Sequence, residues 1–220
     1  MSGYAAYTIA EPTNVFMLRQ ANAETSVLLQ NSDPFVQYAS KIASQVGIRF
    51  AGSLEFRLSE QNAGTSLGIN LTKACIIVPL ELYTAYHSNE SDRSNADLPS
   101  LAEIDFVIAH ECAHIADNHM IISRAAFPIS LFGAYSLISK ISNKWLAAIA
   151  GCATLLLTNV CVSRQIEYRA DAIVAKAGFG PGGVQFFKRS QVRNCEVREL
   201  TKSPMITESG DYLGTQCILC

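Results

Sequence analysis

Two histidines and a glutamate stand at a spacing that suits a metal centre. The run His110-Glu111-Cys112-Ala113-His114 spells H-E-x-x-H inside a stretch with helical character. Histidines four positions apart on an α-helix lie about 40° apart around its axis, so both rings can reach one metal ion. Zinc with three protein ligands keeps a fourth position for water and lowers the pKa of that water towards ~7. His110 and His114 are therefore candidate zinc ligands.

Glu111 is the candidate general base. It lies one step round the helix from His110, too far displaced to share the metal as an equal ligand. A carboxylate beside the metal can instead take the proton of the activated water. The pattern predicts hydrolytic chemistry, and its alternative is a chance match that structural context must decide.

The flanking residues indicate that the motif lies mid-helix and is partly buried. Ser100 and Glu103 have the spacing of a capping box, and Pro99 stops any helix before them. The apolar surface of this helix comes from Ile104, Val107, Ile108, Ala109 and Ile115.

The third ligand does not follow closely in the sequence. His119 lies about 180° round the helix from His110, so it faces away from the metal if the helix runs on. The longer pattern H-E-x-x-H-x-x-G-x-x-H is excluded, because Asp117 stands where glycine is required and Met120 where histidine is required.

Glu167 and Asp171 are better candidates. They lie at i and i+4 on one face of a second predicted helix, which Gly178 ends. One carboxylate can bind the metal and the other can orient a ligand, since metal-binding histidines donate their second ring N–H to such groups. An isolated pair of this kind is usually a solvated helix face. Its place after H-E-x-x-H and an apolar segment favours the metal role.

H-E-x-x-H followed some fifty residues later by Glu167-x-x-x-Asp171, with apolar segments between, resembles the HtpX and type I CaaX prenyl endopeptidase family. The likeness covers roughly residues 35 to 190 and is nearest to the compact mitochondrial and periplasmic members. These are zinc metalloendopeptidases of the gluzincin type. The resemblance implies one Zn²⁺ per chain, a protein or peptide substrate, and peptide-bond hydrolysis at or near a membrane.

Carried over position by position, the resemblance makes His110, His114 and Glu167 the zinc ligands, Glu111 the base and Asp171 the residue that orients a ligand. The family's downstream His-Pro step, with an Arg or His that assists the transition state, has no clear counterpart here. That difference supports an alternative from another class, a catalytically inactive, zinc-containing, membrane-associated binding or adaptor protein.

The periodicity of the chain predicts an α+β fold, mainly helical and zincin-like. A helix is expected from Asp33-Pro34 to Val46 and is closed by Gly47. Three short strands, 54–58, 66–70 and 74–78, predict a small antiparallel sheet. The remaining expectations are a short helix over 80–87, a polar loop over 88–97 and a last helix over 184–200.

Two apolar blocks follow the motif helix, Ala125 to Ser139 and Trp145 to Val162, with a basic turn between them. The second block reaches the ~18 residues needed to cross a bilayer, whereas the first is shorter and contains Pro128. The pattern predicts an apolar helical hairpin at 125–162, between the two metal-ligand helices. It could contact a membrane, or it could be a pair of buried helices in a soluble domain.

The composition sets broad limits. A chain of 220 residues that is 49% hydrophobic can bury a substantial core, which predicts one peptidase domain, 33–200, with an N-terminal segment, 1–32, and a C-terminal tail, 201–220. The net charge of −2 decides nothing, but no basic patch is rich enough to suggest nucleic-acid binding, so no nucleic-acid partner is expected. No signal peptide is recognised, so we expect a membrane-associated or cytoplasmic protein. The oligomeric state stays open.

Seven scattered cysteines predict reduced and mostly buried thiols, with Cys112 a buried core residue. The final residues Cys217-Ile218-Leu219-Cys220 match C-a-a-X, which predicts prenylation of Cys217 in a eukaryotic cytosol. The alternatives are a C-x-x-C redox or metal pair, or a tail with two idle thiols.

Overall fold

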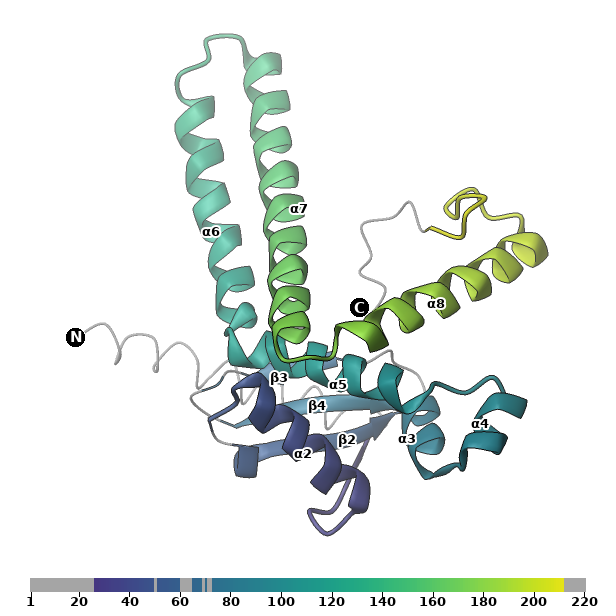
Figure 1. The fold of residues 1–220 in the computed structure, drawn as a ribbon. Coiled ribbons are helices and arrows are strands. Elements are labelled where there is room, and N and C mark those ends of the chain that lie inside the picture. The colour runs from purple at the N-terminus through teal and green to yellow at the C-terminus, as the bar shows by residue number, and fades with distance from the viewer. Residues whose placement is uncertain (1–25, 50, 60–64, 69, 71–72, 212–220) are drawn as a thin grey trace.

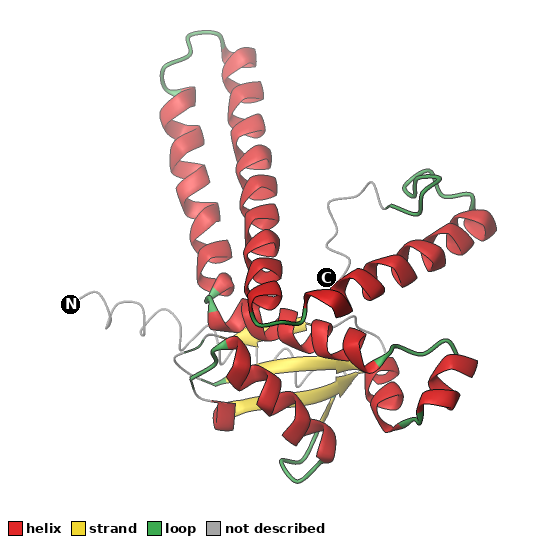
Figure 2. Ribbon diagram, viewed as in Figure 1, coloured by secondary structure: helices red, strands yellow, loops and turns green. Residues whose placement is uncertain are grey.

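A computed structural model of the chain describes residues 26–49, 51–59, 65–68, 70 and 73–211 (Figure 1). It confirms the expected α+β class, with helices dominating and one small sheet (Figure 2). In chain order the elements are β1 (Val27–Leu28), α2 (Pro34–Val46), a 3-10 helix (Ala51–Ser53), β2 (Leu54–Ser59), β3 (Thr65–Gly68), β4 (Ala74–Pro79), α3 (Leu80–His87), α4 (Glu90–Asn95), α5 (Leu101–Ala116), α6 (His119–Ile138), α7 (Lys144–Lys176) and α8 (Gly180–Thr201).

The sheet is mixed, so the expectation of an antiparallel sheet is wrong for its central pair. Its order is β1-β2-β4-β3, with β2 and β4 parallel and both outer pairs antiparallel. The reason is topological. The chain leaves β2, passes to the far side of β4 to form β3, and returns, so that β4 runs beside β2 in the same direction. Ala74 to Val78 of β4 are all buried, as their continuous apolar run requires.

The core lies where α2 and α5 pack together with β2 and β4. Helix α2 has the predicted bounds, because the Asp33 carboxylate accepts the Phe35 N–H at 2.8 Å and Gly47 ends the helix at a φ of 104°. Helix α2 contributes the buried side chains of Phe35, Ala39 and Ile42 to this core. The predicted polar loop instead contains the short helix α4. Asn89 caps that helix by accepting the Asp92 N–H at 2.8 Å, a local bond that composition does not reveal.

Helices α6 and α7 pack along each other and project from the body as a long hairpin (Figure 1). Helix α6 begins at His119, earlier than predicted, and runs through Pro128. Helix α7 is one continuous helix of 33 residues, so the second apolar block and Glu167 lie on a single element.

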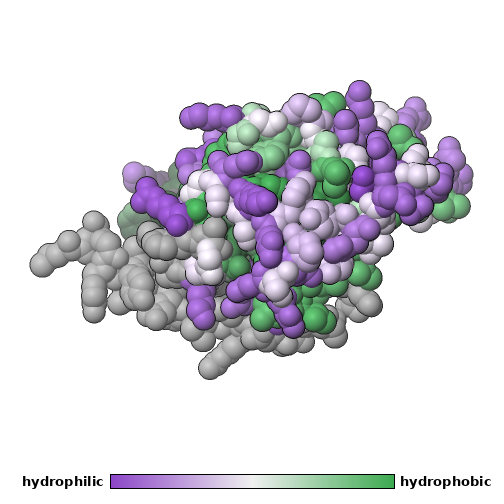
Figure 3. Space-filling view, turned by 60° about the horizontal axis from the view of Figure 1, so that its bottom comes forward, coloured by the Kyte–Doolittle hydropathy of each residue, from purple (hydrophilic) through white to green (hydrophobic). Residues whose placement is uncertain are grey.

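Among the described residues, two helices are long and apolar enough to cross a membrane, and they are α6 and α7. Only 17% of the apolar window in α6 and 11% of that in α7 are buried within the chain, so the alternative of two buried helices is wrong. Trp145 is 82% exposed and Phe132 73%. In contrast, the face of the body seen in Figure 3 is largely polar, with separated apolar patches.

Helix α8 packs against the first half of α5 through two glycines. A Cβ placed at Gly182 would lie 1.8 Å from the carbonyl oxygen of Ala102, so only glycine permits this approach. Further along α8, Arg189 Nε donates to the buried Glu103 carboxylate at 2.8 Å. These contacts fix the N-terminal end of α5, the helix that carries the H-E-x-x-H motif.

Candidate metal centre

Helix α5 begins where the sequence predicts. The Glu103 N–H donates to Ser100 Oγ at 3.3 Å, and the Ser100 N–H donates to Glu103 Oε2 at 2.7 Å, which together make the capping box. The motif occupies the last two turns of this helix, with His110 3% exposed and Glu111 4%. The predicted mid-helix, buried setting of the motif is therefore confirmed, although it lies nearer the C-terminal end.

The structure brings His110, His114 and Glu167 together as one group of potential metal ligands. His110 Nε2 lies 3.0 Å from His114 Nε2 and 3.2 Å from Glu167 Oε2. His114 Nε2 lies 3.6 Å from the same carboxylate oxygen. Three tetrahedral ligands at about 2.0–2.1 Å from zinc stand about 3.3–3.4 Å from one another. The spacing of these atoms therefore fits a zinc ion, and the donor set is one that zinc uses.

Asp171 lies one turn beyond Glu167 on α7 and contacts the outer side of His110. Its Oδ1 is 2.9 Å from His110 Nδ1, the nitrogen that points away from the ligand group. Burial acts to lower the pKa of His110, but the bonds to Asp171 and Glu167 and the charge of Glu111 raise it to about 10 in the metal-free protein. A metal therefore competes with a proton at this ring.

Glu111 lies beside the ligand group without belonging to it. Its side chain is buried, and its negative charge is one of those that raise the pKa of His110. The next residue, Cys112, is fully buried in the core, as expected. Burial raises the pKa of the Cys112 thiol well above its ordinary value, which keeps the thiol protonated and unreactive.

His119 does not face away from the site, because the condition for that expectation, a helix that runs on past Ala116, is not met. Helix α5 ends at Ala116, Asn118 adopts a left-handed conformation with a φ of 54°, and α6 begins at His119. The His119 ring turns back so that its Nδ1 lies 2.9 Å from His114 Nδ1. His119 remains outside the ligand group.

Sequence reasoning missed two further residues beside the centre. Asp117 Oδ2 lies 2.9 Å from His119 Nε2, and Arg169 Nε lies 2.7 Å from the same oxygen. The consecutive pair Asp117-Asn118 was the available clue, because these residue types tolerate left-handed backbone and end helices. It stands directly after the last apolar residues of α5.

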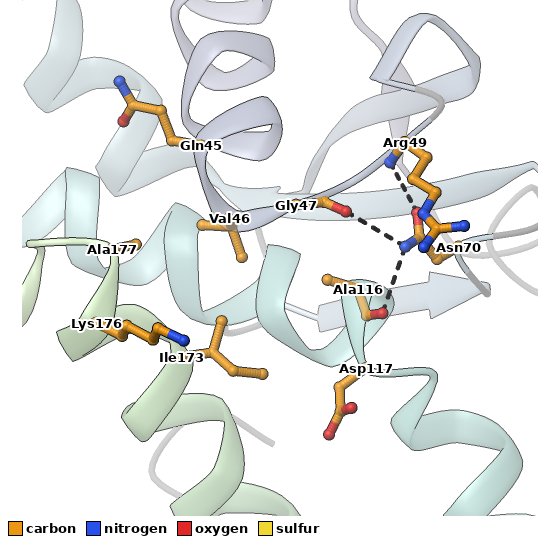
Figure 4. Close-up of a pocket in the computed structure, with 10 residues that line it drawn as sticks. All are labelled: Gln45, Val46, Gly47, Arg49, Asn70, Ala116, Asp117, Ile173, Lys176 and Ala177. Atoms are coloured by element: carbon orange, nitrogen blue, oxygen red, sulfur yellow. Dashed lines mark hydrogen bonds between the residues drawn. The ribbon is translucent and has the colours of Figure 1, made fainter.

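A cavity of about 480 Å³ lies next to the site, between the C-terminal ends of α2, α5 and α7 (Figure 4). Asn70 is fixed at its rim. The amide of Asn70 donates to the carbonyls of Gly47 and Ala116, both at 3.4 Å, and its Oδ1 accepts the Arg49 N–H at 3.0 Å. The cavity reaches Asp117 but none of the three potential metal ligands. The hydrogen bonds of Asn70 tie the end of α5 to the rest of the body.

The other cysteines contribute nothing to the ligand group in the part of the chain that is described. Cys75 is buried like Cys112, whereas Cys152 and Cys161 are exposed on α7, so the described cysteines are not mostly buried as expected. Desolvation by burial raises the pKa of Cys75 to about 12. Cys217 lies outside the described residues.

Comparison with known proteins gives one match. No curated protein and no solved structure matches the chain significantly. The family model of peptidase family M48 matches residues 37–184, a range that includes both the H-E-x-x-H motif and Glu167-x-x-x-Asp171. This match supports metalloprotease chemistry and agrees with the geometry of the ligand group. The chain belongs to peptidase family M48.

Proposed function

We propose that the protein is a zinc-dependent metalloendopeptidase that hydrolyses peptide bonds of protein substrates at or near a membrane. The observation that carries the proposal is the triangle of His110 Nε2, His114 Nε2 and Glu167 Oε2, with sides of 3.0, 3.2 and 3.6 Å. Family membership supports the same chemistry. Within the family we propose a place beside the HtpX and type I CaaX prenyl endopeptidases, because of the Glu167-x-x-x-Asp171 pair.

Zinc, Glu111 and Asp171 have separate roles in the proposed reaction. Bound zinc supplies a Lewis acid that polarises the scissile carbonyl and acidifies water. Glu111 takes a proton from the attacking water and later passes it to the leaving amine. Asp171 accepts the Nδ1–H of His110 and so holds that ring with Nε2 turned to the centre. Burial of His110 and Glu111 limits competing contacts with solvent.

A purely structural zinc site is a poorer account of these residues. Structural sites usually close the fourth position with a protein ligand. In the described part of the chain the group holds three ligands, with no fourth histidine, cysteine or carboxylate in it. Glu111 is a buried carboxylate that lies beside the group without belonging to it, which is where a general base is needed. These points favour the peptidase over the adaptor.

Metal content tests the proposal. Purified wild type should contain about one zinc per chain by elemental analysis, and His114→Ala and Glu167→Ala should each lose it. Glu111→Gln should keep the zinc but lose cleavage of an unfolded protein substrate by a factor of roughly 10²–10⁴. Well-folded wild type without zinc under metal-replete conditions would overturn the assignment, as would full activity in Glu111→Gln.

The membrane part of the proposal is supported by the α6–α7 hairpin. Charged residues bound its apolar length at both ends, with Arg124 and Arg164 near the body and Lys140 and Lys144 at the far turn. Lys144 and Arg164 stand about 30 Å apart along α7 at ~1.5 Å per residue, which matches the ~30 Å hydrocarbon thickness of a bilayer. Glu167 follows Arg164 by one turn, so the centre would lie at the membrane surface.

Strand β3 is the proposed docking edge for an extended substrate. It is the last strand in the sheet order and contacts α5, the helix that carries the H-E-x-x-H motif. An edge strand can pair with an added peptide through main-chain hydrogen bonds. Leu67→Pro should abolish peptide cleavage without loss of zinc, and unchanged cleavage would refute this role.

A further inference from the structure

The most complete side-chain network that the proposed reaction leaves unused begins at His114. From His114 Nδ1 it passes to His119 Nδ1 at 2.9 Å, and from His119 Nε2 to Asp117 Oδ2 at 2.9 Å. Arg169 of α7 then holds the Asp117 carboxylate with two nitrogens, Nε to Oδ2 at 2.7 Å and Nη2 to Oδ1 at 3.0 Å. The network starts on α5, crosses the first residue of α6 and ends on α7.

The backbone break at Asn118 creates this network. In an uninterrupted helix His119 would lie about 140° round from His114 and ~7.5 Å further along the axis. The left-handed conformation of Asn118 turns the chain so that the two rings meet. Asn118 Oδ1 accepts the Asn70 N–H at 2.9 Å, and the Asn70 amide donates to Ala116, so the break is held on both sides. The His119 side chain is 3% exposed, which shields the network from water.

Only one arrangement of protons gives every contact a donor and an acceptor when His114 binds metal. A histidine that ligates through Nε2 carries its proton on Nδ1. His114 Nδ1–H therefore donates to His119 Nδ1, which places the His119 proton on Nε2, from where it donates to Asp117. Two nitrogens of Arg169 also donate to the Asp117 carboxylate, which therefore serves as the acceptor at the end of the chain. The chain of bonds thus defines the tautomer of both rings.

We propose that His119 is a positioning residue of the metal centre, which fixes the orientation and tautomer of His114 and, through Asp117 and Arg169, fastens the end of α5 to α7. The proposal rests on the zinc site proposed above. Arg169 stands two residues after Glu167, so the network links the end of α5, which carries His114, to the helix that carries Glu167. His110 has its own shorter support in Asp171.

Zinc affinity of the full chain in detergent, measured by competition with a chromophoric chelator, tests the proposal. His119→Phe keeps a ring of similar size but removes the acceptor, and should weaken zinc binding about 10- to 100-fold. His119→Asn keeps an acceptor near the position of Nδ1 and should recover at least half of that loss on a logarithmic scale. His87→Phe is the matched control, since His87 is exposed and outside the network, and should bind zinc like wild type.

A second measurement distinguishes positioning from simple packing. In the zinc-loaded protein, proton NMR should show slowly exchanging ring N–H protons from His110, which donates to Asp171, and from His114, which donates to His119. In His119→Phe the His114 proton should exchange rapidly while the His110 proton is unchanged. A packing role alone would leave both protons slow.

The outcomes separate the two proposals. Wild type without zinc would overturn both. Wild type and His119→Phe with zinc affinities within twofold of each other, and an unchanged His114 N–H proton, would overturn the role of His119 alone. Should His119→Phe fail to fold, Arg169→Gln tests the half-exposed outer end of the network. It should cost about twofold to fivefold in zinc affinity, the scale of a surface ion pair, and no loss would refute the link to α7.

Discussion

An arginine in the middle of the α6–α7 hairpin should decide whether this hairpin enters a bilayer. Leu156 is 68% exposed on α7. It stands twelve positions after Lys144 and eight before Arg164, which places it about 18 Å and about 12 Å from the two charged ends. In water, Leu156→Arg at such an exposed site should change the free energy of unfolding by no more than about 0.5 kcal/mol. Near the centre of a bilayer the same side chain costs about 2.5–3.5 kcal/mol.

At about 1.4 kcal/mol per tenfold change, this cost corresponds to a roughly 100-fold lower partition of the hairpin into membrane. Leu200→Arg is the matched control, because Leu200 is 85% exposed on α8 and outside the hairpin. It should partition like wild type. Both variants replace an exposed leucine by arginine, and they differ in whether that leucine lies in the hairpin or in α8.

The fluorescence of Trp145 can be used to measure insertion of the hairpin. This residue is the single tryptophan of the chain, and it stands 82% exposed at the far end of the hairpin. Its fluorescence should be quenched in vesicles whose acyl chains carry bromine, and vesicle flotation gives the bound fraction independently. Equal quenching and flotation of wild type and Leu156→Arg would refute the reasoning, as would wild type that stays monodisperse in buffer and is not quenched.

Three further predictions concern the centre and the packing of α5. The pKa of His110 is raised to about 10, so this ring must lose a proton before it can bind zinc. Apparent zinc affinity should therefore rise about tenfold per pH unit from pH 6 to 8, and calorimetry should show about one proton released per zinc. An affinity that does not change with pH would contradict this. Free zinc at 100 times its Kd should stabilise the protein by about 2.7 kcal/mol in thermal unfolding, and Glu167→Ala should show no such gain. Gly182→Ala should cost roughly 1–3 kcal/mol, because its Cβ meets Ala102, whereas at Gly180 a Cβ lies 3.7 Å from the nearest atom and should be tolerated.

The parts of the fold that depend on neighbouring residues could be predicted from the sequence. The caps at Asp33 and Ser100 depend on side chains within three positions, and both helices begin where these residues predict. The parallel pairing of β2 with β4 could not be predicted, because it depends on which side of β4 the intervening strand occupies. That choice is made by packing against α5, which periodicity does not contain.

Part of the candidate site could likewise be predicted from local sequence, and part could not. Helical geometry alone predicted that His110 and His114 would converge, and the i, i+4 spacing placed Glu167 and Asp171 on one face of α7. The position of His119 could not be derived by extending the helix, because one residue with a positive φ, Asn118, redirects the chain. A single dihedral angle there changes the neighbours of every residue that follows.

The continuity of α7 has a mechanical consequence. Its 33 residues make a helix about 50 Å long that contains no proline, and the part from the exposed Trp145 to the carboxylate pair Glu167 and Asp171 is about 39 Å long. A slip by the rise of one residue, ~1.5 Å, is nearly half of the 3.2 Å between His110 Nε2 and Glu167 Oε2. An axial shift of α7 relative to α5 therefore changes the ligand triangle directly, so the two helices must keep their register for the three ligands to converge.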